Sequence, residues 1–256
     1  MRFALFALLL LTTAACGSPA PLYQIEAAPA EVDGVADEWP AALRPVPSEA
    51  GLSIGLREDG DDLVVVVVAG DDRQSRRIAL GGLTVWVDPT GGTDRVLGVR
   101  YPAPEDPDLE AVVRNAPRRG GPSSTDPQQL RRRFEAGLET VEVTSGVVTQ
   151  RAAPDGGFAG LETAATWGPR GLVVEMRIPL DATPGLLPAP AGEAVGIGVE
   201  LLDSSRAGLR RSMDAARRGA PPAAGDRPMP TPERSAIDPE SVDLETVTRW
   251  LRIELD

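Results

Sequence analysis

A run of five valines, at residues 64–68, constrains the fold of this chain more than any other sequence feature. The apolar stretch around it, residues 63–69, is short and β-branched, which favours a strand that is buried on both faces. Residues 52–56 alternate between apolar and polar or small side chains, which predicts a strand with one buried face. The sequence Asp-Gly-Asp-Asp at 59–62 separates the two stretches and predicts a hairpin turn.

Similar signals recur along the chain and predict ten short strands with turns between them. The predicted strands are residues 52–56, 63–69, 83–88, 95–101, 138–143, 147–151, 160–167, 172–178, 194–202 and 246–255. This pattern predicts an all-β fold, an antiparallel β-sandwich of the immunoglobulin or jelly-roll kind. Two stretches rich in Pro and Arg, at about 102–135 and 204–241, are predicted as long loop insertions, with a short helix near 127–135 in the first.

The first residues have the features of an export signal. Nine apolar residues, 3–11, follow Arg2 and are too short to span a bilayer, but they suit a signal sequence. Residues 13–17 resemble a lipobox, which implies cleavage before Cys16 and a lipid on that cysteine. The alternative is an ordinary secretory signal in which Cys16, the single cysteine of the chain, is a bystander.

With a lipobox, the chain divides into three parts. Residues 1–15 would be a signal peptide, 16–22 a lipidated tether, and 23–256 one β-sandwich domain with its two insertions. We then expect a lipid-anchored protein of the bacterial cell envelope, at the outer membrane or facing the periplasm.

Composition excludes several kinds of function. The chain has no histidine, and its 26 basic residues are all arginine. The absence of histidine removes the commonest general base and the usual zinc and haem ligands, and the absence of lysine removes Schiff-base chemistry. The formal net charge of −12 disfavours nucleic acid as a partner. We therefore predict a protein that is not an enzyme and has no cofactor.

Three motifs in order carry a family resemblance. Residues 32–40, Val-Asp-Gly-Val-Ala-Asp-Glu-Trp-Pro, resemble the opening of family 9 carbohydrate-binding modules and their DOMON-like relatives. Residues 82–91 and 171–180 are similar to the central and late strands of that fold. The local physics predicts a tight turn at Asp33-Gly34 and a structural Trp39 packed against the sandwich. The resemblance implies a non-catalytic domain that binds sugars on exposed tryptophan rings.

Strand alternation selects the candidate ligand-binding residues. Trp86 and Trp250 both lie on the more polar side of their predicted strands, where a large ring is a possible sugar platform. The nearest polar candidates are Asp88, Arg100 and Glu175. The sequence thus predicts carbohydrate binding at the envelope. For the rings, the alternative is that an insertion covers this face and they belong to the core. For the whole protein, the alternative is a structural or partner-binding lipoprotein without sugar affinity.

Three other functions remain open at this stage. Glu162 and Glu175 could form the carboxylate pair of a glycoside hydrolase. A haem would need a methionine or tyrosine as its axial ligand, the methionines being Met176, Met213 and Met229. Calcium would need turn aspartates, which are Asp33, Asp37, Asp88 and Asp94. No calcium-loop spacing is present, so no metal site is predicted.

Overall fold

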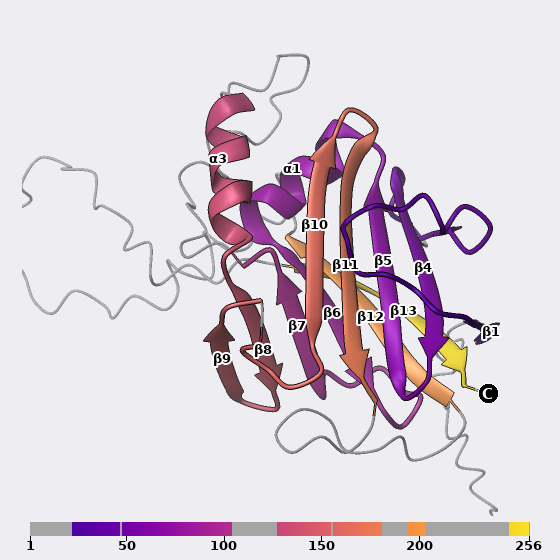
Figure 1. Ribbon diagram of the computed structural model, residues 1–256. Coiled ribbons are helices and arrows are strands. Elements are labelled where there is room, and N and C mark those ends of the chain that lie inside the picture. Colours follow the sequence, from indigo (N-terminus) through magenta and orange to yellow (C-terminus); the bar gives the residue numbers. More distant parts are fainter. Residues whose placement is uncertain are drawn as a thin grey trace, which may run out of the picture.

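Two β-sheets pack face to face in the computed structural model, which describes residues 22–46, 48–103, 127–154, 156–180, 194–202 and 246–255 (Figure 1). The predicted fold class, an all-β sandwich, is confirmed. The predicted signal peptide and nearly all of the tether lie outside the described residues, as do 104–126 of the first insertion and the whole of the second. The division of the chain at its N-terminus therefore stays a prediction.

The sheet drawn at the back of Figure 1 has seven strands. Their order is β1 (Leu22–Gln24), β13 (Thr246–Glu254), β12 (Ala194–Leu202), β6 (Leu83–Asp88), β7 (Leu97–Tyr101), β8 (Val141–Ser145) and β9 (Val148–Ala152). All neighbours are antiparallel except β1 and β13, which pair in parallel.

The sheet in front has six strands. Their order is β10 (Glu162–Gly168), β11 (Gly171–Pro179), β5 (Asp62–Ala69), β4 (Leu52–Asp59) and β2 (Glu26–Ala27), with β3 (Arg44–Pro45) also paired to β4. All ten predicted strands are present, with ends displaced by at most three residues. The three short strands β1, β2 and β3 were not predicted, because two or three residues are too few to show a period.

The core lies between the sheets and is formed by alternate residues of the long strands. In β5, Val65 and Val67 face the core, whereas Val64 and Val66 belong to a second apolar cluster on the outer face. All four side chains are buried. The predicted burial of the valine strand on both faces is therefore confirmed.

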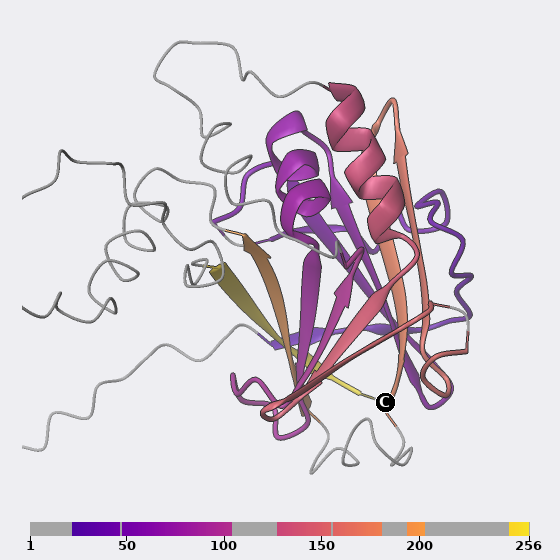
Figure 2. The ribbon, with the colours of Figure 1, turned by 90° about the vertical axis from the view of Figure 1, so that its left-hand side faces the viewer.

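Two helices lie next to each other at one end of the sandwich (Figure 2). Helix α3 (Pro127–Gly137) confirms the predicted helix and packs Phe134 edge-on against Trp167, with ring centroids 5.7 Å apart. Helix α1 (Asp72–Gly81) was not predicted. It begins after Asp71, whose Oδ1 accepts a hydrogen bond from the Gln74 amide at 2.8 Å. Among the described residues, no helix is long and apolar enough to cross a membrane.

The segment after β2 crosses the outer face of the six-stranded sheet (Figure 1). Gly34 has a φ of 78°, and the amide of Val35 donates to Asp33 Oδ1 at 2.7 Å, which confirms the predicted Asp-Gly turn. Trp39 is 0% exposed and packs over Gly55 and Val66, so its predicted structural role is confirmed. The guanidinium of Arg57 lies 4.6 Å from the centre of its ring.

Candidate functional site

The outer face of the seven-stranded sheet brings two tryptophans into one row across four strands. Trp250 of β13 is paired with Gly198 of β12, Gly198 with Trp86 of β6, and Trp86 with Gly98 of β7. We call the surface formed by Trp250, Gly198, Trp86, Gly98 and the adjoining Glu200 the tryptophan face. Tryptophan and glycine alternate along the row. Each ring therefore has a glycine on a neighbouring strand, over which it can lie.

Both rings do lie over these glycines. A Cβ atom at Gly198 would stand 3.1 Å from each of three Trp250 ring atoms, Cδ2, Cε2 and Cε3. A Cβ at Gly98 would stand 2.7–2.9 Å from three atoms of the Trp86 six-membered ring. Since several ring atoms are nearly equidistant from the glycine, each indole presents its face to the sheet. The glycines are therefore what allows the rings to lie on the strands.

Trp86 is covered on its other side as well. It is 8% exposed, and the guanidinium of Arg95 lies 5.4 Å from its ring centre. Its indole Nε1 donates to Glu200 Oε2 at 3.0 Å. The prediction that Trp86 lies on the more polar side of its strand is confirmed, but the prediction of an open ring there is wrong, because Arg95 covers it.

Trp250 is the more open of the two rings. It is half-buried, with one face against Gly198. Among the described residues, none forms a hydrogen bond with its indole nitrogen, and this atom is not one of the buried unpartnered atoms, so the N–H group reaches the solvent. Trp250 therefore offers both an apolar ring and a free donor.

Polar side chains form the neighbouring row. Glu200 Oε2 accepts from Thr248 Oγ1 at 2.7 Å and forms an ion pair with Arg95, which also donates to Thr248 Oγ1 at 2.8 Å. Arg95 is half exposed, so this network reaches the surface beside Trp250. Sequence reasoning missed these three residues. The signal for Glu200 was available, because residues 196, 198 and 200 share one face of their strand.

Two predicted ligand residues on this sheet, Asp88 and Arg100, form hydrogen bonds with other groups of the protein. Asp88 is 0% exposed and caps its own turn by accepting from Thr90 and Asp94 amides. Burial opposes its ionisation, but these bonds outweigh burial and hold the pKa of Asp88 below its usual value. Asp88 is therefore wrong as a ligand residue. Arg100 lies on the predicted face and donates to Gly81 O and Glu142 Oε1.

The predicted role of Glu175 is also wrong, because Glu175 belongs to the other sheet and is 0% exposed. Its Oε2 accepts from the amides of Asp33 and Gly34 at 3.0 and 2.7 Å, and its Oε1 from Trp39 Nε1 at 2.8 Å. Burial raises the pKa of Glu175 to about 6, and these three hydrogen bonds only partly offset that rise. Glu175 thus anchors the N-terminal segment.

The same burial removes the hydrolase hypothesis. A substrate and a water molecule cannot reach Glu175, and Glu162 is paired with Arg177 at 3.0 Å. Met176 is buried in the core, which excludes it as an axial haem ligand; Met213 and Met229 lie outside the described residues. Within the described ranges, no group of three or more acidic side chains is placed to hold a metal ion.

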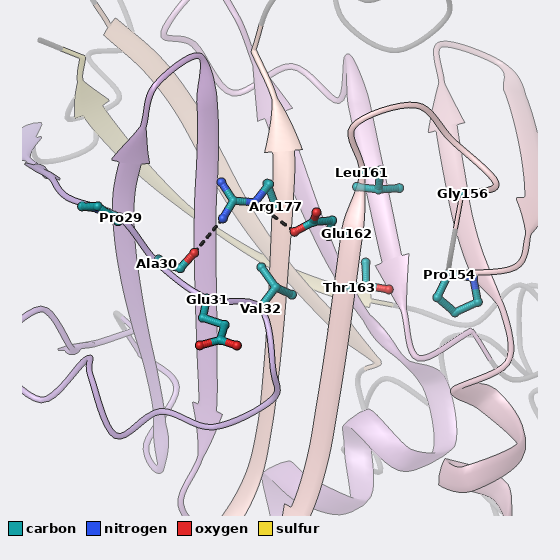
Figure 3. A pocket seen from close by; sticks show the side chains of 10 residues that line it. All are labelled: Pro29, Ala30, Glu31, Val32, Pro154, Gly156, Leu161, Glu162, Thr163 and Arg177. Carbon is teal, nitrogen blue, oxygen red and sulfur yellow. Dashed lines mark hydrogen bonds and ion pairs between the residues drawn. The ribbon is translucent and has the colours of Figure 1, made fainter.

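A hollow of about 720 Å³ on the outer side of the six-stranded sheet is a second candidate site (Figure 3). It is lined by Pro29, Ala30, Glu31, Val32, Pro154, Gly156, Leu161, Glu162, Thr163 and Arg177. Arg177 is fully engaged with Ala30 O, Asp59 and Glu162. None of the described residues that line this hollow is aromatic, so it offers no stacking surface for a sugar.

The solved structures that are similar to this chain include two complexes with sugars. Neither a protein-family model nor a curated protein matches the chain. Both structures are of a carbohydrate binding module of family 9 from Caldicellulosiruptor kristjanssonii. The complex with glucose is 11% identical, with 92% of this chain and 96% of that chain covered and a TM-score of 0.39. The complex with cellotriose is 10% identical, with 92% and 94% covered and a TM-score of 0.37.

The β-sandwich of this chain is evident from its own two sheets, independently of that likeness. The family resemblance drawn from the three sequence motifs stays a prediction.

Proposed function

We propose that this chain is a non-catalytic glycan-binding module whose ligand lies on the tryptophan face, with Trp250 as the stacking platform. The observation that carries the proposal is the half-buried Trp250 ring, laid over Gly198 and supplied with a free indole N–H group. The C–H groups on one face of a sugar ring pack against an aromatic ring, and nearby polar groups fix the orientation of the sugar.

The polar groups needed for such recognition stand beside the ring. Arg95, Thr248 and Glu200 form a connected set of donors and acceptors in the row next to Trp250. Because these side chains hold one another in place, they would lose little conformational freedom when a sugar binds. Trp86 and its Arg95 cover would then form the floor next to the ligand.

We also propose that the module is exported and anchored to the cell envelope by a lipid on Cys16. Support comes from the sequence, in which an apolar run of nine residues and a lipobox-like stretch precede a single cysteine.

The test of glycan binding is a panel of soluble oligosaccharides titrated against the full chain and three variants. Trp250→Ala should weaken binding about tenfold or more, whereas Trp250→Phe keeps a ring and should lose much less. Val147→Ala, at a fully exposed position on the β8–β9 turn, is the control and should bind as the parent does. Unchanged affinity in Trp250→Ala would contradict the proposal. Absence of binding to every glycan, with an envelope protein that co-purifies, would favour the partner-binding alternative.

A further inference from the structure

We infer that the tryptophan face selects an acidic sugar, a uronic acid whose ring stacks on Trp250 while its carboxylate pairs with Arg252. This inference rests on the proposed function and names the class of ligand that the same site takes. Four observations support it: the position of Arg252, its lack of a partner, the burial of its Nε atom with the terminal nitrogens open, and the engagement of the neighbouring carboxylates.

Arg252 stands beside Trp250 on the same face. The two residues are two positions apart in β13, so their side chains leave the strand on one side, with Cα atoms about 6.5 Å apart. In the next strand, Gly196 is paired with Arg252, and Gly198 with Trp250. Gly198 lies under the Trp250 ring, and Gly196 lies under the turn after β6, because a Cβ built on Gly196 would clash with the carbonyl oxygen of Gly92. That turn therefore borders the site next to Arg252.

Arg252 lacks the carboxylate partner that the other arginines of this face have. Arg95 is paired with Glu200, and both Arg100 and Arg151 are paired with Glu142. Among the described residues of this outer face, Arg252 is the arginine without an ion pair. In a chain with 38 acidic side chains, an arginine left without a counter-ion at a candidate site is a natural receptor for an anion.

The inner end of the guanidinium lies against the turn after β6. Its Nε is buried without a hydrogen-bond partner, and it would stand 3.3 Å from a Cβ built on Gly91, which lies in the turn after β6. Nε is the one atom of Arg252 that is both buried and unpartnered. The two terminal nitrogens have no partner among the described residues either, and they therefore reach the solvent. A guanidinium with free terminal nitrogens suits a planar carboxylate, which accepts two parallel hydrogen bonds.

The neighbouring carboxylates leave Arg252 available. Glu200 forms an ion pair with Arg95 and accepts hydrogen bonds from Thr248 and Trp86. Asp88 is buried within its own turn. Glu254 lies two positions along the same face, without an ion pair to Arg252. The net charge of −12 repels anions at long range, but at physiological ionic strength that repulsion is screened beyond about 8 Å.

The experiment compares an oligogalacturonate with its methyl ester by calorimetric titration of the full chain. The two probes share their rings and differ in charge, so their difference measures recognition of the carboxylate. We expect the acid to bind about tenfold more tightly than the ester, with an affinity that falls as salt is raised. Arg252→Gln should remove this preference, because it weakens binding of the acid far more than binding of the ester. Arg151→Gln, which removes the same charge from β9, should keep the preference.

The outcomes separate the inference from the proposed function. Equal affinity for acid and ester, or a preference that persists in Arg252→Gln, would overturn the inference and leave glycan binding intact. Loss of binding of both probes in Trp250→Ala, with the acid preference present in the parent, supports both. Binding of neither probe by the parent, with binding of neutral glycans, overturns the inference alone, and binding of no glycan overturns both. Thermal unfolding of each variant shows that it is folded.

Discussion

At the scale of single residues, Glu175 joins three parts of the molecule through one carboxylate. It lies on β11, binds the turn at Asp33-Gly34 and fixes the indole of Trp39. The opening motif of the sequence is thus completed by a residue about 140 positions later. A buried carboxylate with three donors is costly to ionise, but it holds the N-terminal segment in one position.

The raised pKa of Glu175 predicts a specific pH dependence of stability. Because the folded-state pKa, about 6, is higher than the usual value of 4.5, the folded protein binds the proton more tightly than the unfolded chain does. The contribution of Glu175 is therefore most favourable below pH 4.5 and is lost as pH rises to about 6. The loss amounts to about 2 kcal/mol of unfolding free energy.

Urea unfolding of the parent and of Glu175→Gln between pH 4 and pH 7 measures this contribution. The variant should be less stable at pH 4.5 by about 1–3 kcal/mol, because an amide replaces one of the acceptor oxygens. The gap between the two proteins should narrow by about 2 kcal/mol towards pH 7. If the difference in unfolding free energy between the two proteins widened with pH, the pKa of Glu175 in the folded state would not be raised.

Residue-scale sequence reasoning placed the tryptophans on the correct side but did not establish their exposure. Alternation fixes the side of a strand, because successive side chains point to opposite faces. It does not show which distant group covers a ring. Arg95 reaches over Trp86 from the turn before β7, a contact that depends on how that turn folds. The same limit explains Glu175, whose partners come from the N-terminal segment.

At the scale of elements, the strands were predictable and helix α1 was not. Each long strand carries its own period or a β-branched run, so local residues decide its identity. The sequence of α1 contains few apolar residues, which hides its helical period. Its end signals were nevertheless present, since Asp71 precedes Gln74 by three residues and Gly81-Gly82 follows the last apolar residues.

The pairing of β12 with β13 predicts that Gly198 controls the platform. In Gly198→Ala, the new methyl group would meet the Trp250 ring at 3.1 Å, closer than ordinary packing allows, and the ring must lift from the strand. We expect glycan affinity to fall several-fold and unfolding free energy to fall by about 1 kcal/mol. Gly168→Ala is the matched control, because a Cβ there has nothing within 4 Å. Equal affinities in the two variants would show that the ring position does not matter.

At the scale of the whole molecule, the two sheets have different outer faces. The six-stranded sheet is covered by the N-terminal segment through Trp39, whereas the seven-stranded sheet carries Trp250 and the polar network beside it. Strand β1 pairs with β13 at the edge of the latter sheet. A lipid on Cys16 would be joined to β1 by the five residues 17–21, at most about 20 Å of extended chain, and would hold the tryptophan face near the membrane.

The anchor is tested by Cys16→Ala in a bacterial host that processes lipoproteins. The parent should sediment with the membrane fraction and carry the mass of a lipid at its N-terminus. The variant should lack that mass and leave the membrane fraction, because it has no acyl chains to bury in the bilayer. Lipid-free parent protein cleaved at another bond would instead identify an ordinary secretory signal.

The central claim, that the glycan lies on Trp250, is tested most directly by the indole N–H resonances. The chain has four tryptophans, Trp39, Trp86, Trp167 and Trp250, and hence four such signals, which single substitutions assign. On titration with a glycan that binds, we predict that the Trp250 signal shifts most, that Trp86 follows weakly through Glu200, and that Trp39 and Trp167 stay in place. A shift confined to Trp39 or Trp167, with Trp250 unmoved, would contradict the account.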